Sequence, residues 1–468
     1  MEEHFDMVVV GGGPAGEKAA AQAAYFDKRV VVVERASELG GAMTSSAVTT
    51  KAMREAALYL TGFRRRDIYG ESIDLHPQAV IDRLRFRAVD VAKMLNIAVH
   101  ENLLRHGVEL VTGTAVLGPD RCVIVTEAAN QTRRVLRAPV VLIATGSRPF
   151  HPPGVPFNDP DVLDSETAQD LDHPLGSLLV VGGGAVACEY ASIFMALGAD
   201  VTLVDRGERL LPFLDAECSA EVARSFQSFG MTILHKVGVT HVTRDPSGLR
   251  IETTEGAEFR PQKVIFAAGR MGNTEGLDLP TAGVATDERG RIVVDSHFQT
   301  TAEGIYAAGD VIGPPALASA SMEQGRVAAC YALEIPFKKT VDPLTPFGVY
   351  SIPECAMVGT TEEEAISLGI PYVAGTSRFS SNSRAAISGL TEGMLKLVVG
   401  SDDRRLLGVH IVGEGATELV HQGQAVLHFG GTIDYFIHAT FDVPTLSDAY
   451  KYAAYDCLQR LPAIDAAT

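Results

Sequence analysis

Two stretches of the chain share one pattern of apolar, small and polar positions. Residues 7–36 read MVVVGGGPAGEKAAAQAAYFDKRVVVVERA, and residues 178–207 read LLVVGGGAVACEYASIFMALGADVTLVDRG. In each copy, an apolar run of strand length leads into three glycines, a stretch of small residues follows, and a second apolar run ends in an acid. Continuous apolar runs are typical of parallel strands buried on both faces. The pattern predicts one βαβ unit that occurs twice, and hence an α/β fold.

The spacing within each copy indicates a dinucleotide site. The first glycine, Gly11 or Gly182, is followed 23 residues later by an acid, Glu34 or Asp205. In such motifs the glycines allow a tight turn and a close approach to a pyrophosphate, which the helix start then binds. One glycine motif alone also fits an ordinary turn, but two copies in the same context favour two dinucleotide sites. Their predicted contact residues are Gly11, Gly13, Pro14, Ala15, Gly16, Glu34 and Arg35 in the first, and Gly182, Gly184, Ala185, Val186, Asp205 and Arg206 in the second.

Three later apolar runs also end in small residues. Residues 140–143 lead into Ala144, Thr145 and Gly146, and residues 264–268 lead into Gly269 and Arg270. Both runs read as strands that close a nucleotide domain. A third run, around residue 305, ends at Gly309 and Asp310, before a helix predicted over residues 318–333. Asp310 could bond a cofactor hydroxyl, although Gly-Asp by itself is also an ordinary turn.

Length and charge narrow the classes of protein. At about 150 residues per domain, 468 residues correspond to about three domains. The net charge of -18 argues against a nucleic-acid binder and against a basic membrane-surface protein. Residues 1–10 lack the basic and apolar regions of an export signal, and no apolar run approaches the ~20 residues that span a bilayer. We therefore expect a cytoplasmic protein.

Cysteine and histidine spacing predicts no metal site. The closest two of the six cysteines, Cys330 and Cys355, are 25 positions apart, so zinc and a local redox disulfide are both disfavoured. His421, His428 and His438 lack a metal-ligand spacing and are expected to be ordinary residues of the last third of the chain. The run Arg64-Arg65-Arg66 is expected to be a solvated helix end rather than an anion site. After Pro444, the residues Leu446, Ala449, Ala453 and Cys457 recur at helical spacing and predict a packed terminal helix.

These motifs together resemble the FAD-dependent pyridine nucleotide disulfide oxidoreductases, the family of glutathione reductase, dihydrolipoamide dehydrogenase and mercuric reductase. The resemblance implies that the first motif binds the FAD adenosine, that residues 144–146 close that domain, and that Asp310 binds the flavin ribityl chain. It also assigns Gly41, Gly309 and Ala318 to FAD, and it assigns the second motif with Gly269 and Arg270 to NAD(P). The implied domains are an FAD domain over 1–152 and 276–343, an inserted NAD(P) domain over 153–275, and an α+β interface domain over 344–468.

The chain departs from this family at its two thiol-chemistry positions. Where the family has two cysteines with four residues between them, residues 40–51 read GGAMTSSAVTTK. Ala42, Met43, Ala47 and Val48 lie in that neighbourhood, and the stretch is one residue shorter than in the family. A disulfide relay needs a thiolate, and no side chain here supplies one. Where the family has a histidine base before Pro-Thr, the chain has Val443. Hydride transfer between a nicotinamide and flavin N5 needs neither group.

Within the family, this combination is similar to the soluble pyridine nucleotide transhydrogenases. Lys51 and Glu189 match a pair in which the glutamate holds the lysine near N5, where its charge stabilises reduced flavin. The simpler alternative is a surface lysine and an unrelated helix glutamate. The resemblance also implies a homodimer, in which Pro444 and Thr445 contact the partner subunit's flavin. A departure is that the subgroup usually keeps one cysteine and Ile-Pro-Ser before the lysine, whereas this chain has Val48-Thr49-Thr50.

Nucleotide preference and final acceptor stay open at the level of sequence. Asp205 should accept from the ribose 2'-hydroxyl and so favour NAD(H), whereas Arg206 and Arg209 could bind the 2'-phosphate of NADP(H). The predicted reaction is NADPH + NAD⁺ ⇌ NADP⁺ + NADH. The alternatives are an NAD(P)H-dependent quinone or small-molecule reductase on the same scaffold, and a flavin-binding sensor that has lost turnover.

Overall fold

The computed structural model describes residues 2–63, 68 and 76–461, and their contacts fall into two compact units. The first unit holds residues 1–52, 86–150 and 269–342, and the second holds 53–85, 151–268 and 343–468. Helices α2 (Val48–Thr61) and α4 (Pro77–Arg105) each contribute residues to both. The run Arg64-Arg65-Arg66 lies outside the described residues, so its predicted helix end stays a prediction. Within the described residues, no helix is long and apolar enough to cross a membrane.

The first unit is built on an eight-stranded sheet in the order β1-β6-β5-β4-β3-β2-β7-β18. Strands β3, β2, β7 and β18 are parallel, and β2 and β7 are buried along their whole length, as their unbroken apolar sequences predict. The strands are β1 (Glu2–His4), β2 (Met7–Val10), β3 (Val30–Glu34), β4 (Glu109–Leu117), β5 (Cys122–Glu127), β6 (Arg133–Arg137), β7 (Val140–Ile143) and β18 (Ile305–Ala307), with β8 (Ser147–Pro149) and β17 (Arg270–Gly272) as a separate antiparallel pair.

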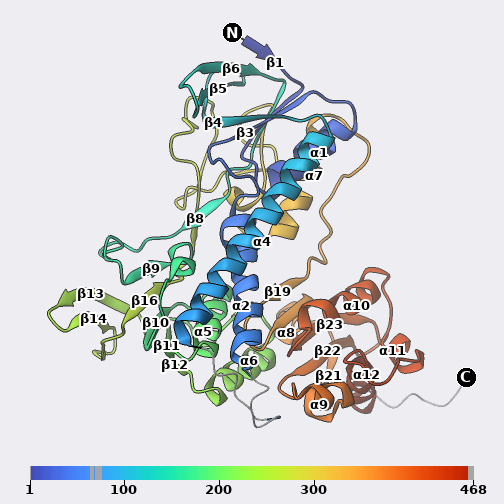
Figure 1. The fold of residues 1–468 in the computed structure, drawn as a ribbon. Coiled ribbons are helices and arrows are strands. Elements are labelled where there is room, and N and C mark those ends of the chain that lie inside the picture. The colour runs from blue at the N-terminus through green and yellow to red at the C-terminus, as the bar shows by residue number, and fades with distance from the viewer. Residues whose placement is uncertain (1, 64–67, 69–75, 462–468) are drawn as a thin grey trace, which may run out of the picture. The chain divides into compact units, whose positions relative to one another are not determined.

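Two helices of small residues pack against each other in this unit, α1 (Pro14–Tyr25) and α7 (Ala318–Ala332) (Figure 1). Gly325 of α7 faces the backbone of α1 so closely that a Cβ there would lie 2.1 Å from the carbonyl oxygen of Ala15. Alanines on both helices supply most of the remaining contact surface. This close approach explains why both helices are rich in small side chains.

The second unit contains the second predicted βαβ copy. Its five-stranded parallel sheet has the order β12-β11-β10-β16-β9, with α5 (Ala185–Ala196) and α6 (Ala216–Ser228) in the connections. A small antiparallel sheet is inserted before the strand that closes the domain. The strands are β9 (Val162–Asp164), β10 (Ser177–Val181), β11 (Asp200–Asp205), β12 (Thr232–His235) and β16 (Lys263–Phe266), then β13 (Val239–Asp245), β14 (Gly248–Thr253) and β15 (Glu258–Phe259).

The last third of the chain forms an antiparallel sheet in the order β19-β20-β23-β22-β21, against which α10 and α12 pack. The predicted terminal helix is confirmed as α12, with Ala449, Ala453 and Cys457 fully buried. The elements are β19 (Phe347–Val349), β20 (Cys355–Gly359), β21 (Tyr372–Arg378), β22 (Met394–Gly400), β23 (Leu406–Val412), α8 (Glu362–Leu368), α9 (Ser383–Ser388), α10 (Ala416–His428), α11 (Asp434–His438) and α12 (Asp448–Arg460).

A buried arginine crosslinks α2 to this last third of the chain. The Arg54 guanidinium is 1% exposed and pairs with Glu55, Glu354 and Glu414 at 2.5, 3.2 and 2.9 Å. It also donates to the carbonyl oxygen of Ser351 at 3.0 Å. In the described part of the chain, these three glutamates are the one group of carboxylates spaced to hold a metal ion. Because the Arg54 guanidinium already pairs with all three, the group reads as a structural ion network.

Lys396 of β22 is a second buried cation that pairs with several carboxylates. Its ammonium lies 2.8 Å from Asp215, the residue that caps α6, and 3.2 Å from Glu217, and it also contacts Glu362. Burial opposes ionisation of Asp215, but Lys396 holds the pKa of that carboxyl below its usual range. Our sequence analysis missed both networks, although a lysine within the apolar strand sequence MLKLVVG was a usable signal.

Removal of the buried arginine should destabilise the protein in a pH-dependent way. Burial raises the pKa of Glu354 even with Arg54 present, although Arg54 works in the opposite direction. In an Arg54→Met variant Glu354 is left without its buried partner, so we expect a loss of about 3–5 kcal/mol at neutral pH. An acid whose folded pKa is raised costs stability only above its unfolded pKa, so the loss should shrink as pH falls through the folded value.

Thermal unfolding of wild type and Arg54→Met at pH 7.5 and at pH 5 would test this expectation. The exposed Arg87, which pairs with Asp90 on α4 at 2.7 Å, supplies the matched control Arg87→Met, for which we expect a change within about 0.5 kcal/mol. A stability loss of Arg54→Met that grows on acidification would contradict the ionic account.

Candidate functional site

The first glycine loop joins β2 to α1 in the first unit. Gly11 has a φ of +107°, and a Cβ on it would lie 2.4 Å from the carbonyl oxygen of Ala144. Helix α1 then begins at Pro14, with Gly13 at its cap position and no side chain bonded to its first amides. A helix start whose N–H groups have no protein cap is a binding site for phosphate. The loop therefore has the geometry that our sequence analysis predicted.

Glu34 completes this loop at the end of β3. One carboxylate oxygen accepts from the Gly12 amide at 2.7 Å, and the other accepts from the Ala36 amide at 3.0 Å. Each oxygen keeps further acceptor capacity, which ribose hydroxyls could use. Arg35, the next residue, is exposed. The acid is thus fixed beside the loop, as its spacing from Gly11 implied.

The carboxyl ends of three neighbouring parallel strands meet at this edge of the sheet. Strand β7 lies between β2 and β18, so Ala144 follows the strand beside the one that precedes Gly11, and Gly309 follows the next strand of the sheet. Thr145 is tied to Asn273, whose carbonyl oxygen accepts from Thr145 Oγ1 at 2.7 Å, and Gly146 follows with a φ of +71°. Ligands bind at such edges in open α/β sheets. The first predicted group of cofactor residues is therefore gathered in one place.

Asp310 is held at this edge by two hydroxyl groups. Ser147 donates to one carboxylate oxygen at 3.0 Å, and Ser321 donates to the other at 3.3 Å. The preceding Gly309 has a φ of +83° and donates its amide to Gln324 at 2.9 Å. Ala318 begins α7, three residues before Ser321. Gly309 and Asp310 are thus a built feature of the unit, and the alternative of an isolated turn does not describe them.

These residues fit a bound dinucleotide in three respects. The amides at the start of α1 have no side-chain cap, the carboxylates of Glu34 and Asp310 are oriented by donors from their own unit, and the backbone packs too closely at Gly11 for a side chain. An adenosine diphosphate moiety needs a phosphate-binding helix start and an acceptor for its ribose. The first unit supplies both.

The segment that lacks the family cysteines lies against this loop. A Cβ on Gly41 would be 3.2 Å from the Cα of Gly13. Residues Met43–Ala47 form a π-helical turn, and the buried Thr44 bonds the carbonyl oxygens of Leu39 and Gly41 at 2.9 and 3.0 Å. Such wide turns occur frequently at functional sites. The Thr44 hydroxyl anchors the turn because it bonds two backbone carbonyl groups, so the segment holds its shape without a disulfide.

Lys51 follows this turn in the first residues of α2. The side chain is half-buried, and its ammonium lies 3.4 Å from Thr50 Oγ1. Lys51 groups with the first unit, whereas Glu189 groups with the second. Their predicted roles as a pair therefore remain a prediction.

The second glycine loop joins β10 to α5 in the second unit and repeats the geometry of the first. Gly182 has a φ of +127°, and a Cβ on it would lie 2.5 Å from the carbonyl oxygen of Ala267. Helix α5 begins at Ala185 without a side-chain cap, and Val186 in its first turn is exposed. A Cβ on Gly184 would meet no atom within 4 Å. This helix start is also open to a phosphate.

Asp205 lies directly on the second loop. Its Oδ2 accepts from the Gly207 amide at 2.9 Å and would be 2.6 Å from a Cβ on Gly183. The two arginines that follow differ in their contacts. Arg206 is exposed, whereas Arg209 pairs with Glu363 at 3.2 Å and donates to the carbonyl oxygens of Pro212 and Leu214. The expectation that Arg209 could serve a 2'-phosphate is not supported, because its guanidinium is already occupied.

Gly269 and Arg270 group with the first unit, although our sequence analysis assigned them to the NAD(P) motif. Arg270 Nε donates to Ser147 Oγ at 2.7 Å, and Nη2 donates to the Ser147 carbonyl oxygen at 2.8 Å. Arg270 thereby reaches the same serine that bonds Asp310. A contact of either residue with a nicotinamide nucleotide stays a prediction.

Glu189 is buried in the second turn of α5 and has a backbone partner. Its Oε1 accepts from the Tyr350 amide at 3.0 Å. One turn later, Ser192 accepts from the Ile352 amide at 3.1 Å. Helix α5 thus fixes the chain that follows β19, a role our sequence analysis did not predict.

Pro444 and Thr445 form the loop that precedes α12. Pro444 is exposed, and Thr445 is fixed by its own hydroxyl, which donates to Asp442 at 2.8 Å, and by Asn382, which donates to its carbonyl oxygen at 3.0 Å. Of the three histidines nearby, His421 bonds Gln424 at 2.9 Å and His428 packs on Phe429. The contact of this loop with a partner subunit's flavin remains a prediction.

All six cysteines are free and buried. Burial raises the pKa of Cys188, Cys218 and Cys355 well above the ordinary thiol value, and it raises the pKa of Cys457 to about 12. A thiol is a nucleophile only as its thiolate. Thiol chemistry at these four positions is therefore disfavoured.

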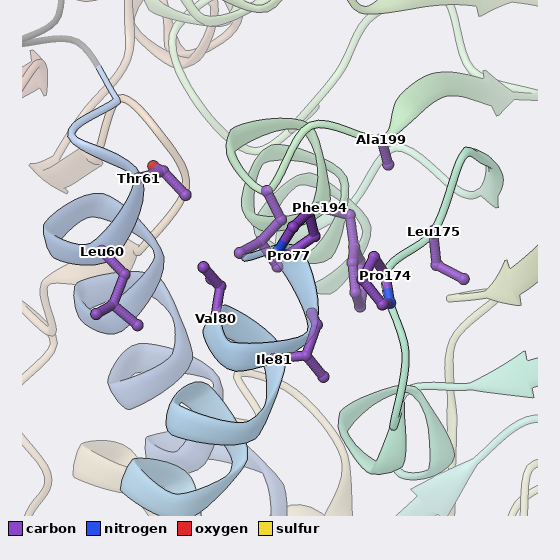
Figure 2. Close-up of a pocket in the computed structure, with 10 residues that line it drawn as sticks. Leu60, Thr61, Pro77, Val80, Ile81, Pro174, Leu175, Phe194 and Ala199 are labelled. Carbon is purple, nitrogen blue, oxygen red and sulfur yellow. The ribbon is translucent and has the colours of Figure 1, made fainter. Parts of the chain in front are cut away.

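The second unit also contains an apolar pocket of about 130 Å³ away from every predicted site residue (Figure 2). Figure 2 shows Val80 of α4 on the side of Leu60 of α2, and Ile81 of α4 on the side of Pro174. Phe194 of α5 also lines the pocket. Thr61 is the one polar side chain among the described residues of this lining, whereas a substrate pocket usually combines an apolar lining with several convergent polar groups. We assign the pocket to imperfect packing between three helices.

Comparison with known proteins agrees with this geometry. Residues 5–325 match the pyridine nucleotide-disulphide oxidoreductase family, and residues 345–454 match its dimerisation domain. A soluble pyridine nucleotide transhydrogenase of Mycobacterium tuberculosis is 40% identical over 98% of both chains, and one of Pectobacterium atrosepticum is 35% identical over 98% of both. The crystal structure of LpdA from M. tuberculosis covers 98% of this chain and 100% of its own, with a TM-score of 0.86 at 27% identity. The chain belongs to the pyridine nucleotide-disulphide oxidoreductase family.

Proposed function

We propose that the protein is an FAD-dependent transhydrogenase that catalyses NADPH + NAD⁺ ⇌ NADP⁺ + NADH. The observation that carries the proposal is a family scaffold with two phosphate-binding helix starts and no thiol or histidine at the positions of disulfide chemistry. The relatives named as transhydrogenases support the same reaction. FAD, when bound, supplies a flavin N5 that can accept a hydride from one nicotinamide and return it to another.

In this proposal the two loops divide the nucleotides between them. The first loop binds FAD through the backbone amides of Gly13, Ala15 and Gly16, with Glu34 accepting from the adenosine ribose and Asp310 from the flavin ribityl chain. The second loop binds NAD(H) or NADP(H) through the amides at the start of α5, with Asp205 accepting from the ribose. Arg206, exposed and directly after Asp205, is the cation nearest in sequence for a 2'-phosphate. A single site that must accept both nucleotides needs an acid and a base of this kind.

Lys51 is proposed to place a fixed positive charge beside the flavin, with Glu189 as its partner. A preorganised charge stabilises negative charge on reduced flavin at no cost in reorganisation. Proton transfer is not required of either residue. This role is compatible with the absence of a histidine base at Val443, because hydride exchange needs electrostatic help rather than an acid.

The match to the dimerisation domain supports a homodimer, and we propose that Pro444 and Thr445 contact the flavin of the partner subunit. We also propose a cytoplasmic location, where nicotinamide nucleotides are abundant and thiols stay reduced. Free buried cysteines are compatible with that compartment.

The central prediction concerns how the reduced flavin is reoxidised. Anaerobic holoenzyme mixed with one equivalent of NADPH should lose its flavin absorbance near 450 nm, and NAD⁺ should restore it with formation of NADH at 340 nm. An oxidised dithiol such as lipoamide should not restore it. Recovery with a quinone but not with NAD⁺ would identify a reductase instead, and no bleaching by either nucleotide would contradict an enzyme altogether.

Lys51→Met should slow flavin reduction by NADPH by about 10- to 100-fold, because it removes one preorganised charge. Stopped-flow measurement of the reductive half-reaction tests this directly. Lys18→Met is the matched control, since Lys18 pairs with Glu17 on α1 and is expected to change the rate by less than twofold. An unchanged reduction rate in Lys51→Met would remove Lys51 from the mechanism.

Asp205, the acid at the second loop, should determine whether NADH or NADPH binds more tightly. Because Asp205 accepts from a 2'-hydroxyl and repels a 2'-phosphate, NADH should bind at least as tightly as NADPH in wild type. Asp205→Asn should improve the relative affinity for NADPH, and Arg206→Met should lower it about tenfold. Titration of flavin absorbance gives both constants, and tighter binding of NADPH to wild type would overturn the role of Asp205.

A further inference from the structure

Three side chains of the first unit form a chain of hydrogen bonds that no nucleotide motif accounts for. Arg270 Nε donates to Ser147 Oγ at 2.7 Å, and Ser147 Oγ donates to Asp310 Oδ2 at 3.0 Å. A second bond, from Arg270 Nη2 to the Ser147 carbonyl oxygen at 2.8 Å, fixes the guanidinium on the serine. All three side chains are half-buried, so water competes with these bonds less than it would at an open surface.

The chemistry of the three side chains determines the donor and the acceptor of each of these hydrogen bonds. A guanidinium has only donors, and an ionised carboxylate has only acceptors. The single hydroxyl proton of Ser147 must therefore go to Asp310, while a lone pair accepts from Arg270. The serine hydroxyl is therefore a fixed link between the Arg270 guanidinium and the Asp310 carboxylate.

The two oxygens of Asp310 are consequently different. Oδ2 receives the serine hydroxyl that the arginine polarises, whereas Oδ1 receives only the longer bond from Ser321, at 3.3 Å. Each carboxylate oxygen has two acceptor positions, so Oδ1 retains strong capacity for another donor. A polyol hydroxyl is the kind of group that such an oriented acceptor binds.

We propose that Ser147 and Arg270 are positioning residues for FAD, which orient Asp310 so that its Oδ1 is presented to a flavin ribityl hydroxyl. The inference rests on the role proposed above for Asp310. Neither residue touches the cofactor in this account, and both act through the aspartate. Their position supports it: Ser147 and Arg270 lie on β8 and β17, an antiparallel pair whose own backbone bonds do not require either side chain.

The adjacent arginine offers a control of the same size and charge. Arg148, also on β8, donates to the Gly272 carbonyl oxygen at 3.0 Å and pairs with Glu275 at 2.5 Å. It lies on the same pair of strands, and its bonds do not lead to Asp310. Loss of Arg148 therefore reports on the strand pair and on Asn273 and Glu275, which follow it, without changing a bond to Asp310.

The test measures how tightly the holoenzyme holds FAD, from the rise in flavin fluorescence as cofactor is released on dilution. We expect Ser147→Ala and Arg270→Met each to weaken FAD binding about tenfold, the cost of one hydrogen bond to a charged group. Ser147→Thr, which keeps the hydroxyl, should hold FAD within about twofold of wild type, and so should Arg148→Met. Far-ultraviolet circular dichroism with excess FAD checks that each variant is folded.

A double-variant cycle separates positioning from a structural effect. If Ser147 acts through Asp310, Ser147→Ala should add almost nothing in an Asp310→Asn background. Additive losses in the double variant, or FAD retention by Ser147→Ala equal to wild type, would overturn the inference while leaving transhydrogenation untouched. FAD retention by Asp310→Asn itself equal to wild type would instead overturn the role proposed for Asp310, and the inference with it.

Discussion

The protein depends on two helix starts that its own side chains leave uncapped. At the beginning of α1 and of α5 the cap residue is a glycine, so the first amides of both helices carry the partial positive charge of the helix with no protein acceptor. Buried apolar strands deliver each start to the edge of a sheet, and the strand alongside approaches too closely for a Cβ at Gly11 or Gly182. The acids Glu34 and Asp205 are bound to the same loops. The geometry of the loop therefore fixes strand length, glycine positions and acid spacing together. This shared requirement explains why the two copies of the motif align in the sequence without a gap.

Because the motif repeats, much of the fold could be predicted from the sequence. Strand and helix positions around both glycine loops depend on local patterns, and the structure confirms them, as it does the terminal helix that buries Ala449 and Ala453. The missed features depend on contacts between residues far apart in the sequence. Arg54 meets Glu354 and Glu414, and Lys396 meets Asp215, only after the chain has folded. The same holds for Arg209, whose occupation by Glu363 no local pattern reveals.

Several residues of the candidate site also stabilise the fold, because they form hydrogen bonds to the backbone. Asp205 binds its own loop with one oxygen, Glu189 fixes the backbone after β19, and Thr44 anchors the turn that replaces a disulfide segment. In each case a side chain bonds a backbone group, and a backbone group stays the same when neighbouring side chains are substituted. The scaffold can therefore lose its thiol chemistry and keep its nucleotide loops. At residues 42–48 disulfide chemistry would depend on side chains, whereas the nucleotide loops use backbone groups.

The burial of every cysteine has a consequence for how the protein behaves under oxidative stress. In a flavoenzyme that works through a dithiol, each turnover exposes a thiolate, which peroxide can oxidise to a sulfenic or sulfinic acid and which soft metals or arsenicals can trap. Here no step of hydride exchange passes through sulfur, and the raised pKa values of Cys188, Cys218 and Cys355 keep those thiols protonated. The same scaffold would thus continue to balance its nucleotide pools under conditions that silence its thiol-dependent relatives.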